Sequence, residues 1–289
     1  METSANGIYY ADNTMGHPDL TNAVGSLTTL FDEILPLANF SKIYTGTSKA
    51  VYQSNDPESS QLFFRLDDTV GANARCRGYE TMSDVDTGTG LFPLDSQVSG
   101  GFYVYKSAAG TARPWRFYSN GKIFYLFIDP NSNGTWSCGT LFGDGNSFVA
   151  NDFYGTLIGG STSINAAWAF STLNYTTGIC IARALNQDGG SIYATRQSHA
   201  KTTFFGYTSN SQFFPRKADN RLSLYPVDYW DSTTDERGRL PGLWNPIHNG
   251  DIPEGYEFSN IPALPSRVLK TQSTGMATRQ CLMDKTGPW

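Results

Sequence analysis

The sequence has little charge and no long apolar run. Charged residues make up 16% of its 289 residues, against roughly 25% in an average soluble domain. The formal net charge is -5, and the lysines and arginines are scattered along the chain, so the basic patch of a duplex-binding protein is missing. No stretch approaches the roughly 20 apolar residues of a membrane span. We therefore expect neither nucleic-acid binding nor membrane insertion.

Cysteine and histidine are too sparse for the familiar metal and redox motifs. The cysteines form no CxxC and no Cys/His pair, and they are Cys76, Cys138, Cys180 and Cys281. Without zinc-site spacing, free and buried thiols are expected. None of the three histidines lies in a recognisable nucleophile and base signature. The sequence therefore predicts a non-enzymatic protein with no catalytic residue, no cofactor and no metal site.

Long runs of helix formers are also scarce, and only one segment predicts a helix. Asp19 is a candidate N-cap, and Pro36 is expected to end the helix. One helical stripe lies between them, formed by Leu20, Val24, Leu27, Leu30, Phe31, Ile34 and Leu35. The stripe must pack either on the body of this chain or on a neighbouring subunit. The preceding residues, 1 to 18, read as an extended arm.

The residues that are abundant favour strands and turns. Tyr, Phe, Thr and Val suit a pleated, half-buried surface, while Gly, Asn and Asp supply the backbone conformations of tight turns. Period-two runs occur at residues 49–54, 61–67 and 75–82. Asn120-Gly121 between two aromatic runs predicts a type I′ hairpin over residues 115–127, which residues 135–142 extend to a meander. The glycine-rich stretch from 139 to 145 reads as a strand end and a turn.

Further strands are predicted in the second half of the chain, at residues 153–159, 178–184, 191–196, 202–207 and 221–225. After Trp230 five prolines follow within about 25 residues, which argues against central strands. This part is predicted to be an ordered, irregular extension. A small hairpin is expected around Ser273-Thr274-Gly275, and the aromatic Trp289 suggests a docked C-terminus.

Together these patterns predict an all-β protein with an antiparallel, β-sandwich-like body. The N-terminal arm and short amphipathic helix cover residues 1–45, the body covers 46–230, and a Pro-rich C-terminal extension covers 231–289.

Three polar or aromatic patterns leave other interpretations open. Glycan hydrolysis by paired carboxylates depends on the separation of the carboxyl groups in space. The candidates are Asp67, Asp68, Asp84 and Asp86, and the sequence favours solvated turn carboxylates over a catalytic pair. The run from Asp84 to Gly90 has the alternating oxygen atoms of a calcium loop, but Gly88 occupies its third ligand position. Aromatic rings can stack on sugars or fill a β core, and the candidates are Trp115, Trp136, Trp168, Tyr207 and Trp230.

Three segments together resemble a family of tailed-bacteriophage and prophage virion structural proteins. The first runs from Tyr9 to Gly16 and into the helix. The second is the most specific and includes Ala50 to Pro57, Arg65 to Thr69 and the stretch GYETMSDVDTGTG, residues 78–90. The third is RGRLPGLW, residues 237–244, with His248 close behind. The resemblance spans most of the chain and includes no enzymatic motif.

The resemblance implies a virion protein, assembled in the cytoplasm of a bacterial host. We expect a multi-copy tail or baseplate component, bound to other phage structural proteins and forming a homo-oligomeric ring or symmetric array. A head or collar decoration or connector protein is one alternative. A receptor-binding module at the tail tip, with a host-surface glycan as its partner, is another. Apolar, Arg and Trp side chains suit interface anchors, and the candidates are Leu27, Phe31, Arg237, Arg239, Leu243, Trp244, His248 and Trp289.

Overall fold

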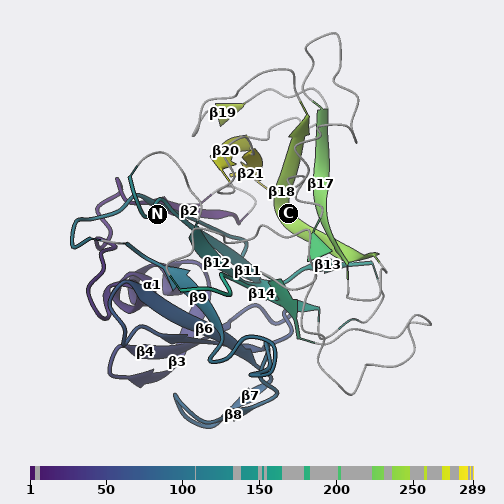
Figure 1. Cartoon of the computed structure of the whole chain (residues 1–289). Helices are drawn as coiled ribbons and strands as arrows, with labels where there is room; N and C mark the ends of the chain where they lie inside the picture. Colours follow the sequence, from purple (N-terminus) through teal and green to yellow (C-terminus); the bar gives the residue numbers. More distant parts are fainter. Residues whose placement is uncertain are drawn as a thin grey trace.

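The computed structural model in Figure 1 describes residues 1–3, 7–107, 109–132, 138–148, 152, 155–164, 179–182, 201–202, 223–230, 236–247, 257–258, 269–273, 280–285, 287 and 289. Across these residues the chain is mostly β, with antiparallel sheets and one helix. The predicted all-β, sandwich-like fold is confirmed. No helix in the described ranges is long and apolar enough to cross a membrane.

A seven-stranded antiparallel sheet forms the middle layer. Its order is β1 (Glu2–Thr3), β2 (Tyr9–Asp12), β10 (Trp115–Ser119), β11 (Ile123–Ile128), β12 (Cys138–Asp144), β14 (Thr156–Gly159) and β15 (Ile179–Ile181). Every residue of β11 is buried, because alternate side chains enter two different cores. Phe124, Leu126 and Ile128 lie in one core, while Ile123, Tyr125 and Phe127 lie in the other.

A five-stranded antiparallel sheet covers one face of the middle layer. Its order is β3 (Phe40–Gly46), β4 (Lys49–Ser54), β5 (Phe63–Asp67), β6 (Asn73–Tyr79) and β9 (Phe102–Tyr105), and β7 (Thr81–Met82) pairs separately with β8 (Gly88–Thr89). The period-two prediction for this region is confirmed. Helix α1 (Ser26–Leu37) shares the core between the two sheets. Ring centroids of Phe31 and Phe64 lie 6.0 Å apart, and Phe124 lies 5.6 Å from Phe31.

The helix is shorter than the sequence predicts. It begins after Gly25, whose φ is +80°, and Asp19 does not cap it. The Leu20 carbonyl accepts the backbone N–H of Arg113 at 2.8 Å, so the chain before Gly25 follows the sheet instead of coiling. Pro36 lies inside the last turn and does not end the helix before it. The predicted start at Asp19 was therefore wrong, while the helix ends one residue after Pro36.

The third sheet covers the other face of the middle layer. Its order is β16 (Lys201–Thr202), β17 (Ser223–Trp230), β18 (Glu236–Ile247), β21 (Gln280–Asp284), β20 (Leu269–Ser273) and β19 (Glu257–Phe258), and β13 (Asn146–Ser147) also pairs with β18. Figure 1 shows this sheet beyond β11 and β12, on the side away from β3 and β4. Its buried side chains include Val227, Leu243 and Met283. Three layers therefore enclose two cores.

The prediction that the proline-rich segment forms no central strand was wrong. Strand β18 carries Pro241 and Pro246 and has β17 on one side and β21 with β13 on the other. The pairing with β17 is interrupted between Trp244 and Arg239, where Gly242 has a φ of +74°. Pro241 therefore sits in a break of the ladder, where its missing N–H costs no sheet hydrogen bond.

The predicted hairpin over 115–127 is confirmed as β10 and β11, but its turn is of another type. The Asn120 N–H donates to the Ile123 carbonyl at 3.2 Å, so Gly121 and Lys122 form the loop. Only Gly121, with a φ of +86°, is positive among these four. This is the φ pattern of a type II′ turn, whereas type I′ needs two positive values.

Strand β12 confirms the predicted third strand of the meander and corrects the interpretation of residues 139–145. Most of that stretch is strand interior, since Gly139 and Gly143 pair with Phe127 and Ile123. A Cβ on Gly139 would lie 1.8 Å from the Leu126 carbonyl oxygen. These glycines therefore allow close strand contact and do not form a turn.

Hydrogen-bonded pairs cross both predicted domain boundaries. Strand β2 of the N-terminal segment pairs with β10, and β17 pairs with β18 across residue 230. Strands β20 and β21 pair where the small hairpin was expected. Of the other predicted strands, 153–159 and 178–184 contain β14 and β15, while 191–196 lies outside the described residues.

Candidate functional site

A polar cleft of about 230 Å³ opens beside the β10–β11 turn, where β12, β13 and β14 approach one another. Its lining is polar or glycine throughout and comprises Glu58, Ser59, Ser60, Asn120, Lys122, Asp144, Gly145, Asn146, Ser147, Asp152 and Gly155. Figure 1 places β13 at the junction between the middle sheet and β18. The cleft therefore lies where two of the three sheets meet.

Asp144, the last residue of β12, is fixed by three donors. One carboxylate oxygen accepts the backbone N–H of Ser60 at 2.6 Å. The other accepts the Ser60 hydroxyl at 2.6 Å and the Thr156 hydroxyl at 2.7 Å. Hydrogen bonds to an ionised acceptor are stronger than neutral ones. This carboxylate is therefore held in one orientation at the wall of the cleft.

Asp152 is the second carboxylate of the cleft, and its side chain is only 1% exposed. Its Oδ2 accepts hydrogen bonds from the Arg237 guanidinium at 3.1 Å and from the Ser147 hydroxyl at 2.8 Å. Its Oδ1 is buried and accepts no hydrogen bond in the described structure. An unpaired buried acceptor costs about 1–3 kcal/mol. This oxygen is therefore a buried, unpaired acceptor beside the cleft.

Tyr229 packs behind these two carboxylates. Burial raises the pKa of its hydroxyl, and the charges of Asp152 and Asp144 raise it further, while Arg237 lowers it. A Cβ on Gly238 would lie 2.7 Å from this hydroxyl oxygen, so glycine is needed for the ring to fit. The phenol and the Arg237 guanidinium form a wall behind the residues that line the cleft.

The third segment of the resemblance supplies part of this wall. Arg237 is buried on Asp152. Arg239 is exposed, pairs with Asp228 at 2.9 Å and lies with its guanidinium carbon 5.5 Å from the centre of the Phe148 ring. These two candidate interface residues, which flank Gly238, thus lie in different environments. Only Arg239 offers a charged surface to a partner.

The apolar interface candidates are largely covered by the chain itself. Leu27 and Phe31 are fully buried in the core, so these two residues have no surface left for a subunit. Most of the predicted stripe packs on the body of the chain, but Val24 lies before the helix and is 56% exposed. Leu243 is buried in the other core, and Trp244 is half-buried. His248 lies outside the described residues.

Trp289 packs on the chain, as the sequence suggests. Its ring centroid lies 5.8 Å from that of Tyr125 in an edge-on arrangement, and its indole N–H donates to the Asp284 carbonyl at 2.9 Å. A Cβ on Gly242 would clash with this indole. The glycine of the third segment therefore provides the space in which Trp289 lies.

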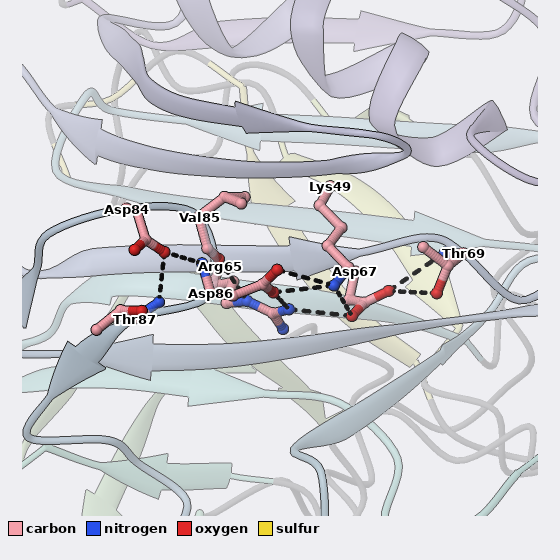
Figure 2. A network of polar contacts seen from close by, with 8 residues as sticks. All are labelled: Lys49, Arg65, Asp67, Thr69, Asp84, Val85, Asp86 and Thr87. Carbon is pink, nitrogen blue, oxygen red and sulfur yellow. Dashed lines mark hydrogen bonds and ion pairs between the residues drawn. The ribbon is translucent and has the colours of Figure 1, made fainter.

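The second segment of the resemblance forms the network drawn in Figure 2. Asp84 accepts the backbone N–H groups of Asp86 and Thr87 at 2.7 and 2.8 Å. Asp86 in turn accepts the Lys49 ammonium at 2.9 Å and also bonds the Arg65 guanidinium. The hydrogen bonds from Lys49 and Arg65 lower the pKa of Asp86.

This network argues against a calcium loop. Two cationic side chains already neutralise Asp86, and Arg65 also donates to Asp67 at 3.0 Å. The Arg65 Nε donates to the Val85 carbonyl at 2.8 Å, which fills another oxygen that a metal ion would need. The residues instead tie the β7–β8 loop to β4 and β5, as Figure 2 shows.

Asp68 is not the solvated turn carboxylate that the sequence allows. It is fully buried, as is Lys106, with which it forms an ion pair. Its Oδ2 accepts the N–H groups of Leu27 and Thr28 at 2.7 and 3.2 Å. It therefore caps the N-terminus of α1 from the end of β5, where a negative charge is favourable. Burial raises the pKa of the Asp68 carboxyl and lowers that of the Lys106 ammonium, and the pairing opposes both shifts.

Trp115, one of the residues expected to stack on sugars, does not line the cleft. Trp115 is fully buried in the core beside the helix. Trp136, Trp168 and Tyr207 lie outside the described residues, and only the backbone of Trp230 is described. Sequence reasoning missed Asp144 and Asp152, because their partners Ser60 and Arg237 lie in distant parts of the chain.

Cys76, Cys138 and Cys180 are buried, as the sequence predicts for these three. In the described ranges, no three His, Cys, Asp or Glu side chains are grouped so that they could hold a metal ion.

Comparison with models of known protein families gives no match, and comparison with curated proteins gives no significant match either.

Proposed function

We propose that this chain is a non-enzymatic structural protein of a tailed-phage virion, present in several copies in the tail or baseplate. The proposal starts from the resemblance carried by residues 78–90 and 237–244. The observation that supports it best is that the charged residues of these two segments form ion pairs and hydrogen bonds within the chain. Their described contacts join strands and loops of this chain.

In the second segment the carboxylates hold a loop. Asp84 shapes the turn between β7 and β8, and Asp86 joins that turn to Lys49 of β4 and Arg65 of β5. In the third segment Arg237 joins β18 to Asp152. Ion pairs that cross between elements fix the shape of a subunit, which suits a protein that must present the same surface in every copy of an assembly.

Quantitative mass spectrometry of purified particles tests this proposal. Particles from a host that encodes the chain are banded on a density gradient, digested and compared with labelled peptides of this chain and of the major capsid and tail proteins. We expect a fixed number of copies per particle that follows the tail proteins. A copy number that varies with that of the major capsid protein would instead indicate a head or collar protein. Its absence from banded particles would contradict the proposal.

The non-enzymatic part has its own test. Purified protein is spotted on lawns of the host and incubated with isolated surface polysaccharide, and released reducing ends are measured. We expect no clearing and no new reducing ends. Depolymerisation that is lost in Asp144→Asn would instead assign catalysis to the cleft.

A further inference from the structure

We propose that the side chains of Lys106 and Asp68 condense to an isopeptide bond inside the folded chain. Asp68 directly follows β5 and Lys106 directly follows β9, and β6 lies between these two strands in the sheet. The bond is a single modification of the chain and not a turnover reaction. It is independent of the role proposed for the virion, since it is measured on the isolated protein. Three features of the pair carry the inference.

The first feature is the position of the two reacting groups. The Lys106 ammonium donates to Asp68 Oδ1, and both side chains are 0% exposed. Two further contacts hold the lysine, since Nζ donates to the Ala23 carbonyl at 2.7 Å and the backbone N–H donates to the Ala72 carbonyl at 2.9 Å. Well-oriented intramolecular reactions reach effective molarities of roughly 10⁵–10⁸ M. The amine therefore loses little further freedom when it attacks the carboxyl carbon.

The second feature is a pair of donors on the other carboxyl oxygen. Asp68 Oδ2 accepts the backbone N–H groups of Leu27 and Thr28 at 2.7 and 3.2 Å. Negative charge develops on an oxygen when an amine adds to a carboxyl carbon. Here the two N–H groups and the positive end of the α1 dipole already face that oxygen, as in an oxyanion hole. Oδ2 thus remains as the amide oxygen, and Oδ1, on the lysine side, is the leaving oxygen.

The third feature is the protonation state that burial favours. Condensation needs a neutral amine and a neutral carboxyl. Burial raises the pKa of the Asp68 carboxyl and lowers that of the Lys106 ammonium, and both shifts persist although the attraction between the two groups opposes them. A dry interior favours the uncharged forms. The amide removes two buried charges, and its oxygen can keep the hydrogen bonds from Leu27 and Thr28.

The step balances without a further reactant. A bond forms between Lys106 Nζ and the carboxyl carbon of Asp68, and the bond from that carbon to Oδ1 breaks. Oδ1 leaves as water with the acid proton and one proton from the amine. No atom changes its oxidation state, so neither an oxidant nor a reductant is needed. The product closes a covalent loop over residues 68–106.

Mass spectrometry of the purified, folded chain tests the proposal. We expect the intact mass to be lower than that of the sequence by one water molecule. Trypsin does not cleave after an acylated lysine, so residues 66–75 should be released joined to a peptide that runs through residue 106 uncut. The pair of Lys42 and Asp32 is the internal control, because its atoms lie 2.9 Å apart but both side chains are about one-third exposed. It should give no linked peptide.

Three variants locate the bond. Lys106→Met and Asp68→Ala should each show the full mass of their sequence and no linked product. Ser26→Ala is the matched control, because the Ser26 hydroxyl accepts from Nζ at 3.3 Å but is neither reacting group. It should keep the linked product, with far-ultraviolet circular dichroism like that of the parent.

The parent chain alone decides the outcome, even where a variant does not fold. A full parent mass, with residues 66–75 unlinked and cleavage after Lys106, would overturn the proposal. A loss of water that persists in Lys106→Met would also overturn it, since the dehydration would then lie elsewhere in the chain.

Discussion

Replacing Lys106 with methionine should destabilise the fold by about 3–5 kcal/mol, because this lysine is the buried partner of the carboxylate that caps α1. Asp68 and Lys106 both have 0% side-chain exposure. Removing one partner of a buried pair leaves the other charge uncompensated, and measured costs of this change are about 3–5 kcal/mol. The ammonium also donates to the Ala23 carbonyl at 2.7 Å, which adds about 1 kcal/mol or less.

Urea unfolding followed by tryptophan fluorescence measures this cost by linear extrapolation. Lys42→Met is the matched control, because Lys42 pairs with Asp32 at 2.9 Å but both side chains are about one-third exposed. Such a surface pair contributes roughly 0–1 kcal/mol. The double variant Asp68→Asn with Lys106→Met should recover part of the loss, since no buried charge is left unpaired. If Lys106→Met and Lys42→Met differed by less than about 1 kcal/mol, the reasoning would be refuted.

Three further predictions concern the network, the core and the turn. The hydrogen bonds from Lys49 and Arg65 lower the pKa of Asp86 in the folded protein. The stability that this carboxylate contributes is therefore present above its ordinary pKa of about 3.9, and it is lost as the pH falls through the lower pKa of the folded state. Asp86→Asn should therefore lower the free energy of unfolding by less than about 1 kcal/mol at pH 7. In acid its urea midpoint should approach that of the parent. A difference between the two midpoints that grew in acid would contradict this. Phe64→Ala should lower the free energy of unfolding by about 3–5 kcal/mol, and Phe148→Ala by less than about 0.5 kcal/mol. Similar urea midpoints for the two variants would contradict this. Gly121→Ala should cost about 1–2 kcal/mol, because its φ of +86° disfavours a side chain; an unchanged thermal midpoint would argue against this turn.

The features that sequence reasoning predicted correctly are local ones. The Asn120-Gly121 pair marks a turn by its own backbone preferences, and the aromatic runs beside it can only form strands. The hairpin follows from about a dozen residues. The period-two runs of β4, β5 and β6 could be predicted for the same reason. The alternation of apolar and polar residues within one strand depends only on which face of that strand is buried.

Contacts between distant residues explain the errors. The cap of α1 is Asp68, about forty residues after the Leu27 and Thr28 N–H groups that it accepts, whereas the local pattern favours Asp19. The prolines of β18 argue locally against a strand, but the break at Pro241 and the positive φ of Gly242 let the strand bend and continue. Neither effect can be read from the neighbouring residues.

The cleft was hidden for the same reason. Asp144 and Asp152 are close in sequence, but their partners Ser60 and Arg237 lie more than eighty residues away in opposite directions. A carboxylate in a polar stretch gives no sign that it will be buried on a guanidinium. Only the meeting of the middle and third sheets turns these residues into a site.

Antibody labelling of intact particles tests the central claim most directly. Gold-labelled antibody raised against the purified chain is applied to unfixed particles and viewed by negative-stain electron microscopy, with particles from a deletion strain complemented by an unrelated tail gene as the control. The account predicts several gold particles at the tail or baseplate of each virion. Unlabelled virions, with the chain found only in the soluble fraction of the lysate, would contradict it.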